Sequence, residues 1–157
     1  MFKKRIKNVD IEFEELSQML FLFEEDPTLE RDFLLNANLE FSLESLKKID
    51  DYLEKIKSHP EFENNYSKIV LRVGAYVGQV IKLNSKKNFH WYDFENSIKI
   101  NRELEQFGES IATVALLIDK DNDETLFPLA KVCKFLENGR EDSVYFFAQV
   151  AIDEKSL

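Results

Sequence analysis

Arg72, Tyr76 and Gln79 follow one another at spacings of four and three residues, so one face of a helix would present all three side chains. A cation, a phenol and an amide on a single face offer a small molecule one charged contact and two further hydrogen-bonding groups. We therefore take these three residues as one wall of a candidate binding site.

A second group, His90, Trp91 and Tyr92, lies in a short segment with the composition of a strand. Along a strand, His90 and Tyr92 would share one face and Trp91 would take the other. A core tryptophan flanked by surface polar groups is the simpler interpretation. The alternatives are a ligand pocket or the centre of a protein interface, where Trp and Tyr are favoured.

Metal binding has little support in the sequence. The acidic run 119–123 resembles a calcium loop, but Glu124 and Ala130 occupy the sixth and twelfth positions, where an EF-hand needs Gly and Glu. The two histidines and the one cysteine do not make a zinc site unless carboxylates complete it. We expect no metal and no cofactor, and we expect the acidic run to be a solvated turn.

Covalent or acid–base catalysis has equally little support. Cys133 lies within a predicted helix, with no base and no helix N-terminus beside it in the sequence, so we expect a small, buried or half-buried apolar side chain. The adjacent carboxylate pairs, such as Glu14 and Glu15, are not at a recognisable catalytic spacing, although any two carboxylates can converge in space. The sequence therefore favours a protein that is not an enzyme.

The charge is strongly acidic and unevenly distributed. The net charge is −9, and four basic residues stand within the first seven, so the rest of the chain carries 17 basic against 30 acidic residues. Such a surface repels phosphate backbones, which argues against nucleic acid as a partner, and suits a basic protein. A single cysteine and the absence of a long apolar run predict a cytoplasmic protein that does not enter a membrane.

The spacing of apolar residues predicts most of the helices. Helices are expected over 10–24, 29–36, 66–83 and 126–136, over a segment capped by Ser42 and ending before Pro60, and over a last segment beginning at Asp142 or Ser143 with Val144, Phe147, Val150 and Ala151 on its apolar face. Gly74 and Gly78 lie on one face of the helix over 66–83. Because glycine weakens a helix, close packing of a neighbour against that face is expected.

Strands are expected in the middle of the chain, at 89–92 and at 111–118, the second buried on both faces. The segment 93–107 stays open: Asp93 could cap a helix that Gly108 ends, or a strand could run through 97–100. These elements predict one α+β domain over 1–157, with a small antiparallel sheet of two to four strands packed by four or five helices. Residues 1–9 are left open as a flexible segment.

Three motifs carry a family resemblance. The segments SLESLKKID from Ser42, GAYVGQVI from Gly74, and FPLAKV from Phe127 running into NGREDSV resemble, in that order, a group of small uncharacterised bacterial proteins of the domain-of-unknown-function type. The resemblance implies Glu where this chain has Gln79. It supplies no activity, and the link to immunity proteins encoded beside secreted toxins is one of association.

Two functions follow as hypotheses. The first is a non-enzymatic protein-binding module, in the form of an immunity protein that occludes the site of a basic toxin. The alternative is a small-ligand-binding domain or cryptic enzyme with one pocket around Tyr76 and His90. A mimic of DNA is a third possibility, but it needs acidic groups spaced like phosphates. The oligomeric state is open.

Overall fold

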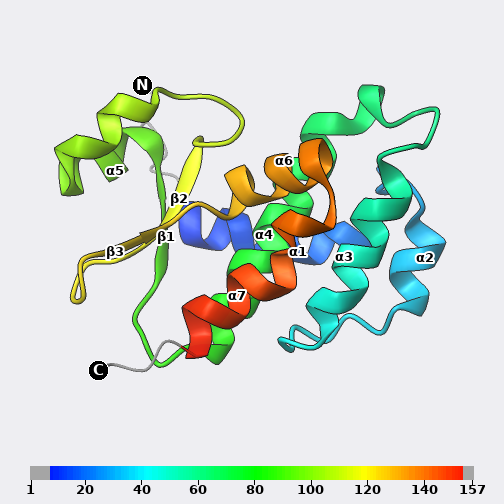
Figure 1. Ribbon diagram of the computed structural model, residues 1–157, viewed down its shortest axis with the longest axis horizontal. Helices are drawn as coiled ribbons and strands as arrows, with labels where there is room; N and C mark the ends of the chain where they lie inside the picture. The colour runs from blue at the N-terminus through cyan, green and yellow to red at the C-terminus, as the bar shows by residue number, and fades with distance from the viewer. Residues whose placement is uncertain (1–7, 154–157) are drawn as a thin grey trace, which may run out of the picture.

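The computed structural model describes residues 8–153 (Figure 1). In chain order the elements are α1 (Val9–Leu22), α2 (Arg31–Asn36), α3 (Ser45–Ile56), the 3-10 helix η1 (Glu63–Asn65), α4 (Tyr66–Asn84), β1 (His90–Asp93), α5 (Phe94–Ile100), η2 (Arg102–Phe107), β2 (Ala115–Asp119), β3 (Glu124–Leu126), α6 (Pro128–Asn138), η3 (Arg140–Asp142) and α7 (Val144–Asp153). The α+β class and the small antiparallel sheet are confirmed. The described part has seven α-helices, which is more than the four or five predicted in total: α2 falls within the helix expected over 29–36, and α5 lies in the segment that was left open.

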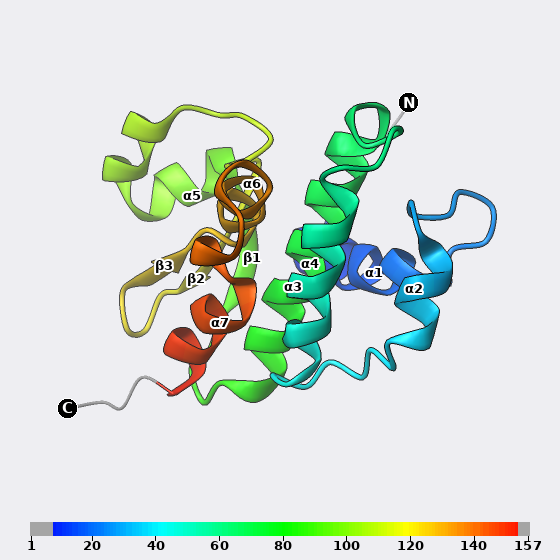
Figure 2. The same ribbon diagram turned by 45° about the vertical axis from the view of Figure 1, so that its right-hand side comes forward.

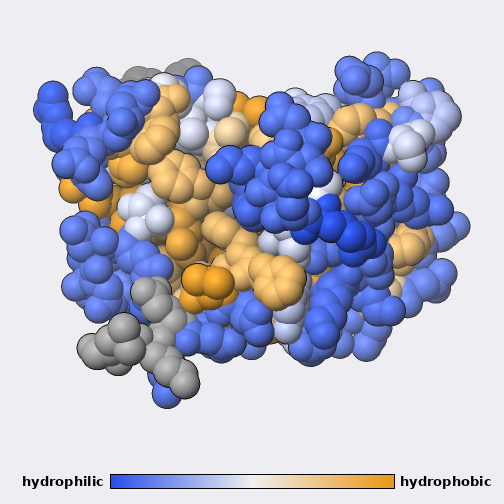
Figure 3. Space-filling model, viewed as in Figure 1, coloured by the Kyte–Doolittle hydropathy of each residue, from blue (hydrophilic) through white to orange (hydrophobic). Residues whose placement is uncertain are grey.

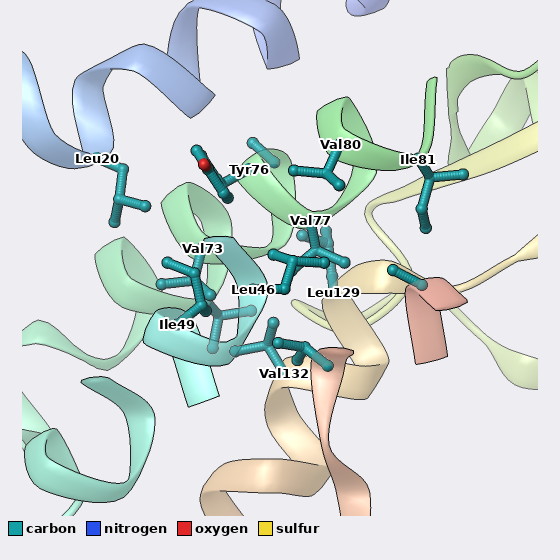
Figure 4. Close-up of a cluster of buried hydrophobic side chains, with 14 of the residues drawn as sticks. Leu20, Leu46, Ile49, Val73, Tyr76, Val77, Val80, Ile81, Leu129 and Val132 are labelled. Carbon is teal, nitrogen blue, oxygen red and sulfur yellow. The ribbon is translucent and has the colours of Figure 1, made fainter. Parts of the chain in front are cut away.

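Helix α4 is the centre of the molecule. Its apolar residues recur at helical spacing all round the helix, and they are buried because α1 covers one side while α6 and α7 pack against another (Figures 1 and 2). Figure 4 shows Val73, Tyr76 and Val80 between Leu20 of α1 and the side chains of α3 and α6. Burial of these side chains is the main source of stability in this part of the fold.

The two glycines of α4 are sites of close packing, as predicted. A Cβ atom at Gly74 would lie 2.2 Å from Leu129 Cδ2, and one at Gly78 would lie 2.1 Å from Cζ2 of the Trp91 ring. Any side chain at either position would therefore collide with a neighbour. Gly78 is what allows the sheet to approach the central helix.

The sheet has the order β1-β2-β3, and both pairs are antiparallel. Trp91 pairs with Leu117, and Tyr92 pairs with Leu116. Because side chains alternate along a strand, Leu117 joins the main core with Trp91. Leu116 faces the opposite way and packs with Ile118 and Leu104 in a second, small core below α5 and η2. Strand β2 is thus buried on both faces, as expected.

Several boundaries differ from the prediction. The open segment 93–107 is helical: the Asp93 carboxylate accepts a hydrogen bond from the Asn96 amide at 2.8 Å and caps α5. The strand predicted at 111–118 begins only at Ala115. Before it, the Thr113 hydroxyl donates to the Gly108 carbonyl and accepts from the Ser110 amide, which holds this segment in a turn.

The apolar face predicted for the last helix was wrong in one residue. Val144, Ala148 and Ala151 are buried, whereas Val150 is 68 % exposed. The small side chains face inward because α7 lies against α3 and α4. Phe146 and Val150 remain on the outside.

The expected flexible segment lies mostly outside the described residues, and its last two positions are ordered: the Asn8 side chain accepts from the Ile11 amide at 3.2 Å, and Val9 begins α1. Among residues 8–153, no helix has the length and apolar character needed to cross a membrane.

Candidate functional site

His90 is held by a carboxylate of α1. Asp10 accepts hydrogen bonds from Lys82 Nζ at 2.7 Å and from the Trp91 amide at 2.8 Å, and His90 Nδ1 lies 2.6 Å from its second oxygen. Burial raises the pKa of Asp10, but the hydrogen bonds from Lys82, Trp91 and His90 outweigh it, so the pKa lies below the ordinary value. The ionised carboxylate joins α1, α4 and β1, and His90 belongs to this structural contact.

Tyr76 serves the loop before α3. Its hydroxyl accepts from the Phe41 amide at 2.9 Å and lies 2.7 Å from the hydroxyl of Ser45. Since Ser45 donates to the Ser42 carbonyl, Tyr76 donates to Ser45, and both hydrogen-bonding capacities of the phenol are used within the protein. The residue is fully buried, and burial raises the pKa of the phenol.

Arg72 holds the segment between α1 and α2. Nη1 donates to the Asp26 carbonyl at 2.7 Å and to the Thr28 hydroxyl at 3.0 Å, while Nη2 pairs with the Asp26 carboxylate at 3.2 Å. Burial lowers the pKa of the guanidinium, and Asp26 opposes that shift. This cation is committed to protein oxygens.

Gln79 and Trp91 are buried in the centre of the fold. The Trp91 ring stacks on Phe13 with 4.4 Å between ring centroids. Among the described residues, Gln79 Oε1 and Trp91 Nε1 have no hydrogen-bond partner. Trp91 is thus a core residue and not an exposed contact residue, which agrees with the simpler interpretation of its segment.

Tyr92 lines an open cavity of about 600 Å³. Its ring lies 5.3 Å from Lys120 Nζ. The cavity is lined by Asn8, Val9, Trp91, Tyr92, Asp93, Asn96, Lys99, Ile100 and Lys120. None of the four cavities described in this section is lined by Tyr76 or His90, so none of them joins the two groups of predicted site residues.

The acidic run after β2 closes a turn. Asp119, which we expected to be solvated, is fully buried. Its carboxylate accepts from the Asp121 amide at 2.9 Å and from the Asn122 side chain at 2.6 Å. Burial raises the pKa of Asp119, but the hydrogen bonds to the carboxylate lower it by more, so the pKa lies below the ordinary value. Residues 8–153 contain no group of three or more His, Cys, Asp or Glu placed to hold a metal ion.

Cys133 is half-buried, as expected, and its thiol contacts the Tyr66 hydroxyl. Burial raises the pKa of the thiol, which keeps it protonated at neutral pH. A protonated thiol is a poor nucleophile, so this side chain is suited to packing.

A surface that the sequence analysis missed runs along α1. Residues 8–30 contain eight acidic residues and no Lys or Arg, and four of the acidic residues, Asp10, Glu24, Asp26 and Glu30, pair with basic residues of later segments. The side chains that point outward are Ile11, Glu14, Glu15, Gln18 and Leu22, which we call the α1 face. A shallow hollow of about 340 Å³ lies beside it, between Glu15 and Phe23. The sequence does contain a signal for this face. Phe13, Ser17 and Leu20 recur at helical spacing and are buried, so the residues on the opposite side of the helix are exposed.

A second surface of a different kind lies between β3, α6 and α7. Two cavities of about 510 and 370 Å³ share Leu126, Lys131 and Phe147 as lining residues, and we call them together the apolar groove. Phe107 and Phe127 line one end, and Phe146 and Val150 line the other. Figure 3 shows apolar residues gathered over this part of the surface.

Comparison with known proteins gives no relative: no family model, no curated protein and no solved structure matches this chain. The family resemblance therefore stays a prediction, and the function has to be argued from the two surfaces.

Proposed function

We propose that this protein is a non-enzymatic binding module that holds a basic protein against the α1 face, and that the partner is a bacterial toxin which it neutralises. The observation that carries the proposal is the charge of this face. Glu14 and Glu15 are exposed, and neither forms an ion pair with a described residue.

The apolar residues of the α1 face support the same role. Ile11 is 52 % exposed and Leu22 is 54 % exposed, and they stand at the two ends of the α1 face. An interface commonly combines apolar anchors, which bury area, with charges that steer the partner and select it. A basic toxin brings the charge that this face lacks. Occlusion of the toxin's site would then need no chemistry from this chain.

The test is to purify the protein encoded beside this one and to measure its affinity for this chain by calorimetry at rising salt. We expect that protein to be basic and to bind. Replacement of Glu14 and Glu15 by Gln should weaken binding about tenfold at low salt and less at high salt, because screening removes the electrostatic part. The matched control replaces the exposed Glu95 and Glu103 by Gln, which changes the net charge equally at a distant place.

Leu22→Ser tests the apolar anchor and should weaken binding at every salt concentration. Its control is Leu83→Ser, which removes an equally exposed leucine at the end of α4. Binding that does not depend on salt, or controls as harmful as the α1 variants, would reject the α1 face as the binding surface.

A further inference from the structure

The apolar groove differs from the α1 face in its charge. Lys131 Nζ lies 2.9 Å from the Asp142 carboxylate, and Glu124 pairs with Lys87, so these four charges are matched within the chain. Two further charged residues stand at the groove. Lys134 lines only the larger cavity, and Glu141 lines only the smaller one. The groove is therefore close to neutral, with its remaining cation and anion in different cavities.

The apolar groove has both protruding apolar side chains and hollows between them. Phe146 is 62 % exposed and Val150 is 68 % exposed at the α7 end, and Phe107 is 55 % exposed at the other end, where its ring packs edge-on against Phe127. Exposed apolar side chains that gather on one face of a folded chain are typical of an interaction site. The same patch offers both protruding rings and the hollows that could receive them.

We infer that the apolar groove is the contact surface for a second copy of this chain. In a twofold dimer the same patch meets itself, so residue i of one copy contacts residue j of the other, and j contacts i. Turned through 180°, the Phe146 end of one copy faces the Phe107 end of its partner. Lys134 of each copy then faces Glu141 of the other. A groove of this charge pattern complements itself, whereas a basic partner finds no excess of acid there.

This inference goes beyond the proposed function and does not depend on it. The dimer uses β3, α6 and α7, and α4 separates α7 from α1 (Figure 2). Both copies in a dimer would keep their α1 faces open, and each could hold one partner molecule.

The experiment is sedimentation equilibrium of the purified chain, with no partner present. The expected result is the mass of two chains at high concentration and of one chain on dilution. Phe146→Ser and Val150→Ser should each raise the dissociation constant of the dimer about tenfold or more. Both residues are exposed, so the fold tolerates the change, and Leu83→Ser is the control that should leave the dimer intact.

A charge exchange tests the twofold arrangement. Lys134→Glu and Glu141→Lys should each weaken the dimer, and the double variant should restore it, because the pair is rebuilt with reversed signs. A monomer at all concentrations would overturn the inference. If the groove variants of such a monomer also lost affinity for the basic protein, the groove would belong to that partner. Loss of partner binding in α1 variants that still dimerise would leave it standing.

Discussion

The helices on the right of Figure 1 and the sheet lobe on its left, formed by β1–β3, α5 and η2, bury apolar side chains on very different scales. Within the described residues, the main core contains 27 buried hydrophobic residues, of which Trp91, Ala115 and Leu117 come from the strands. The separate core inside the lobe contains three of the described residues, Leu104, Leu116 and Ile118. Since burial is the main favourable contribution to folding, the helical part sets the stability of the whole chain.

The lobe is stable because it is attached, and the attachment is local. Trp91 packs against Gly78 and Phe13, and Asp10 bonds to the backbone of β1. The helical part uses polar contacts differently: the buried Asp50 of α3 accepts from the Val144 amide at 2.8 Å and the Ser143 hydroxyl at 2.6 Å, which caps α7 from another helix. A small substructure can thus depend on a few contacts at one junction, and a large core can distribute its support.

The largest expected effect separates the two cores directly. Leu46→Ala in the main core should lower the free energy of unfolding by about 3–4 kcal/mol, because a closely packed site collapses poorly around the cavity. Leu104→Ala should cost less, about 2 kcal/mol, because Leu104 is slightly exposed and its core has only three buried residues among those described. Urea unfolding measures both values, and equal losses would show that the lobe is as integral to the fold as the helices.

The same pair has a distinct signature in hydrogen exchange. Leu104→Ala should speed exchange in β2, β3 and α5 while the amides of α4 keep their protection, because the lobe opens as a unit. Leu46→Ala should speed exchange throughout the chain. A uniform increase in both variants would remove the distinction between the two parts.

The helical part could be predicted far better than the lobe, and the reason is physical. The apolar residues of a long amphipathic helix recur at a regular local spacing, so α1, α3 and α4 were predicted to within a few residues. The lobe depends on side chains that compete with regular structure. Thr113 diverts the start of the predicted strand into a turn, and the capping bond of Asp93 selects a helix where a strand was equally plausible.

The candidate site was harder still, because sequence spacing shows which residues share a face but not what covers that face. Arg72, Tyr76 and Gln79 do lie on one buried helix, and distant segments use the first two as anchors. The partners Asp26 and Phe41 are 46 and 35 positions away from them. The α1 face and the apolar groove could be identified only after the buried faces were known, because packing decides which side chains stay exposed.

An intermediate effect is expected at the junction itself. Gly78→Ala places a Cβ against the rigid ring of Trp91 and should lower the free energy of unfolding by about 1–3 kcal/mol. Trp91 is the only tryptophan, so its fluorescence should report the displaced ring. Gly74→Ala should cost less, because its shortest contact is with the end of the Leu129 side chain, which can rotate, while the Leu129 Cα lies 3.3 Å away. The control is the exposed Ser67→Ala on the same helix, expected to have little effect.

The smallest expected effect depends on pH and concerns the second contact at the junction. Asp10→Asn should lower the free energy of unfolding by about 1 kcal/mol at neutral pH, because the amide keeps the shape but loses the charge that Lys82 and His90 meet. The pKa of Asp10 is depressed by folding, so the stability that its charge contributes is present above the ordinary value of 3.8.

That contribution disappears as the pH falls through the lower pKa of the folded state. The difference between the wild type and Asp10→Asn should therefore stay constant from pH 7 to about pH 5 and shrink below 3.8. Urea unfolding of both proteins is measured at each pH. The contributions of the carboxylates that both proteins contain, including Asp26 and Asp119, then cancel in the difference. A difference that does not change with pH would mean that shape alone, and not charge, holds the lobe to α1.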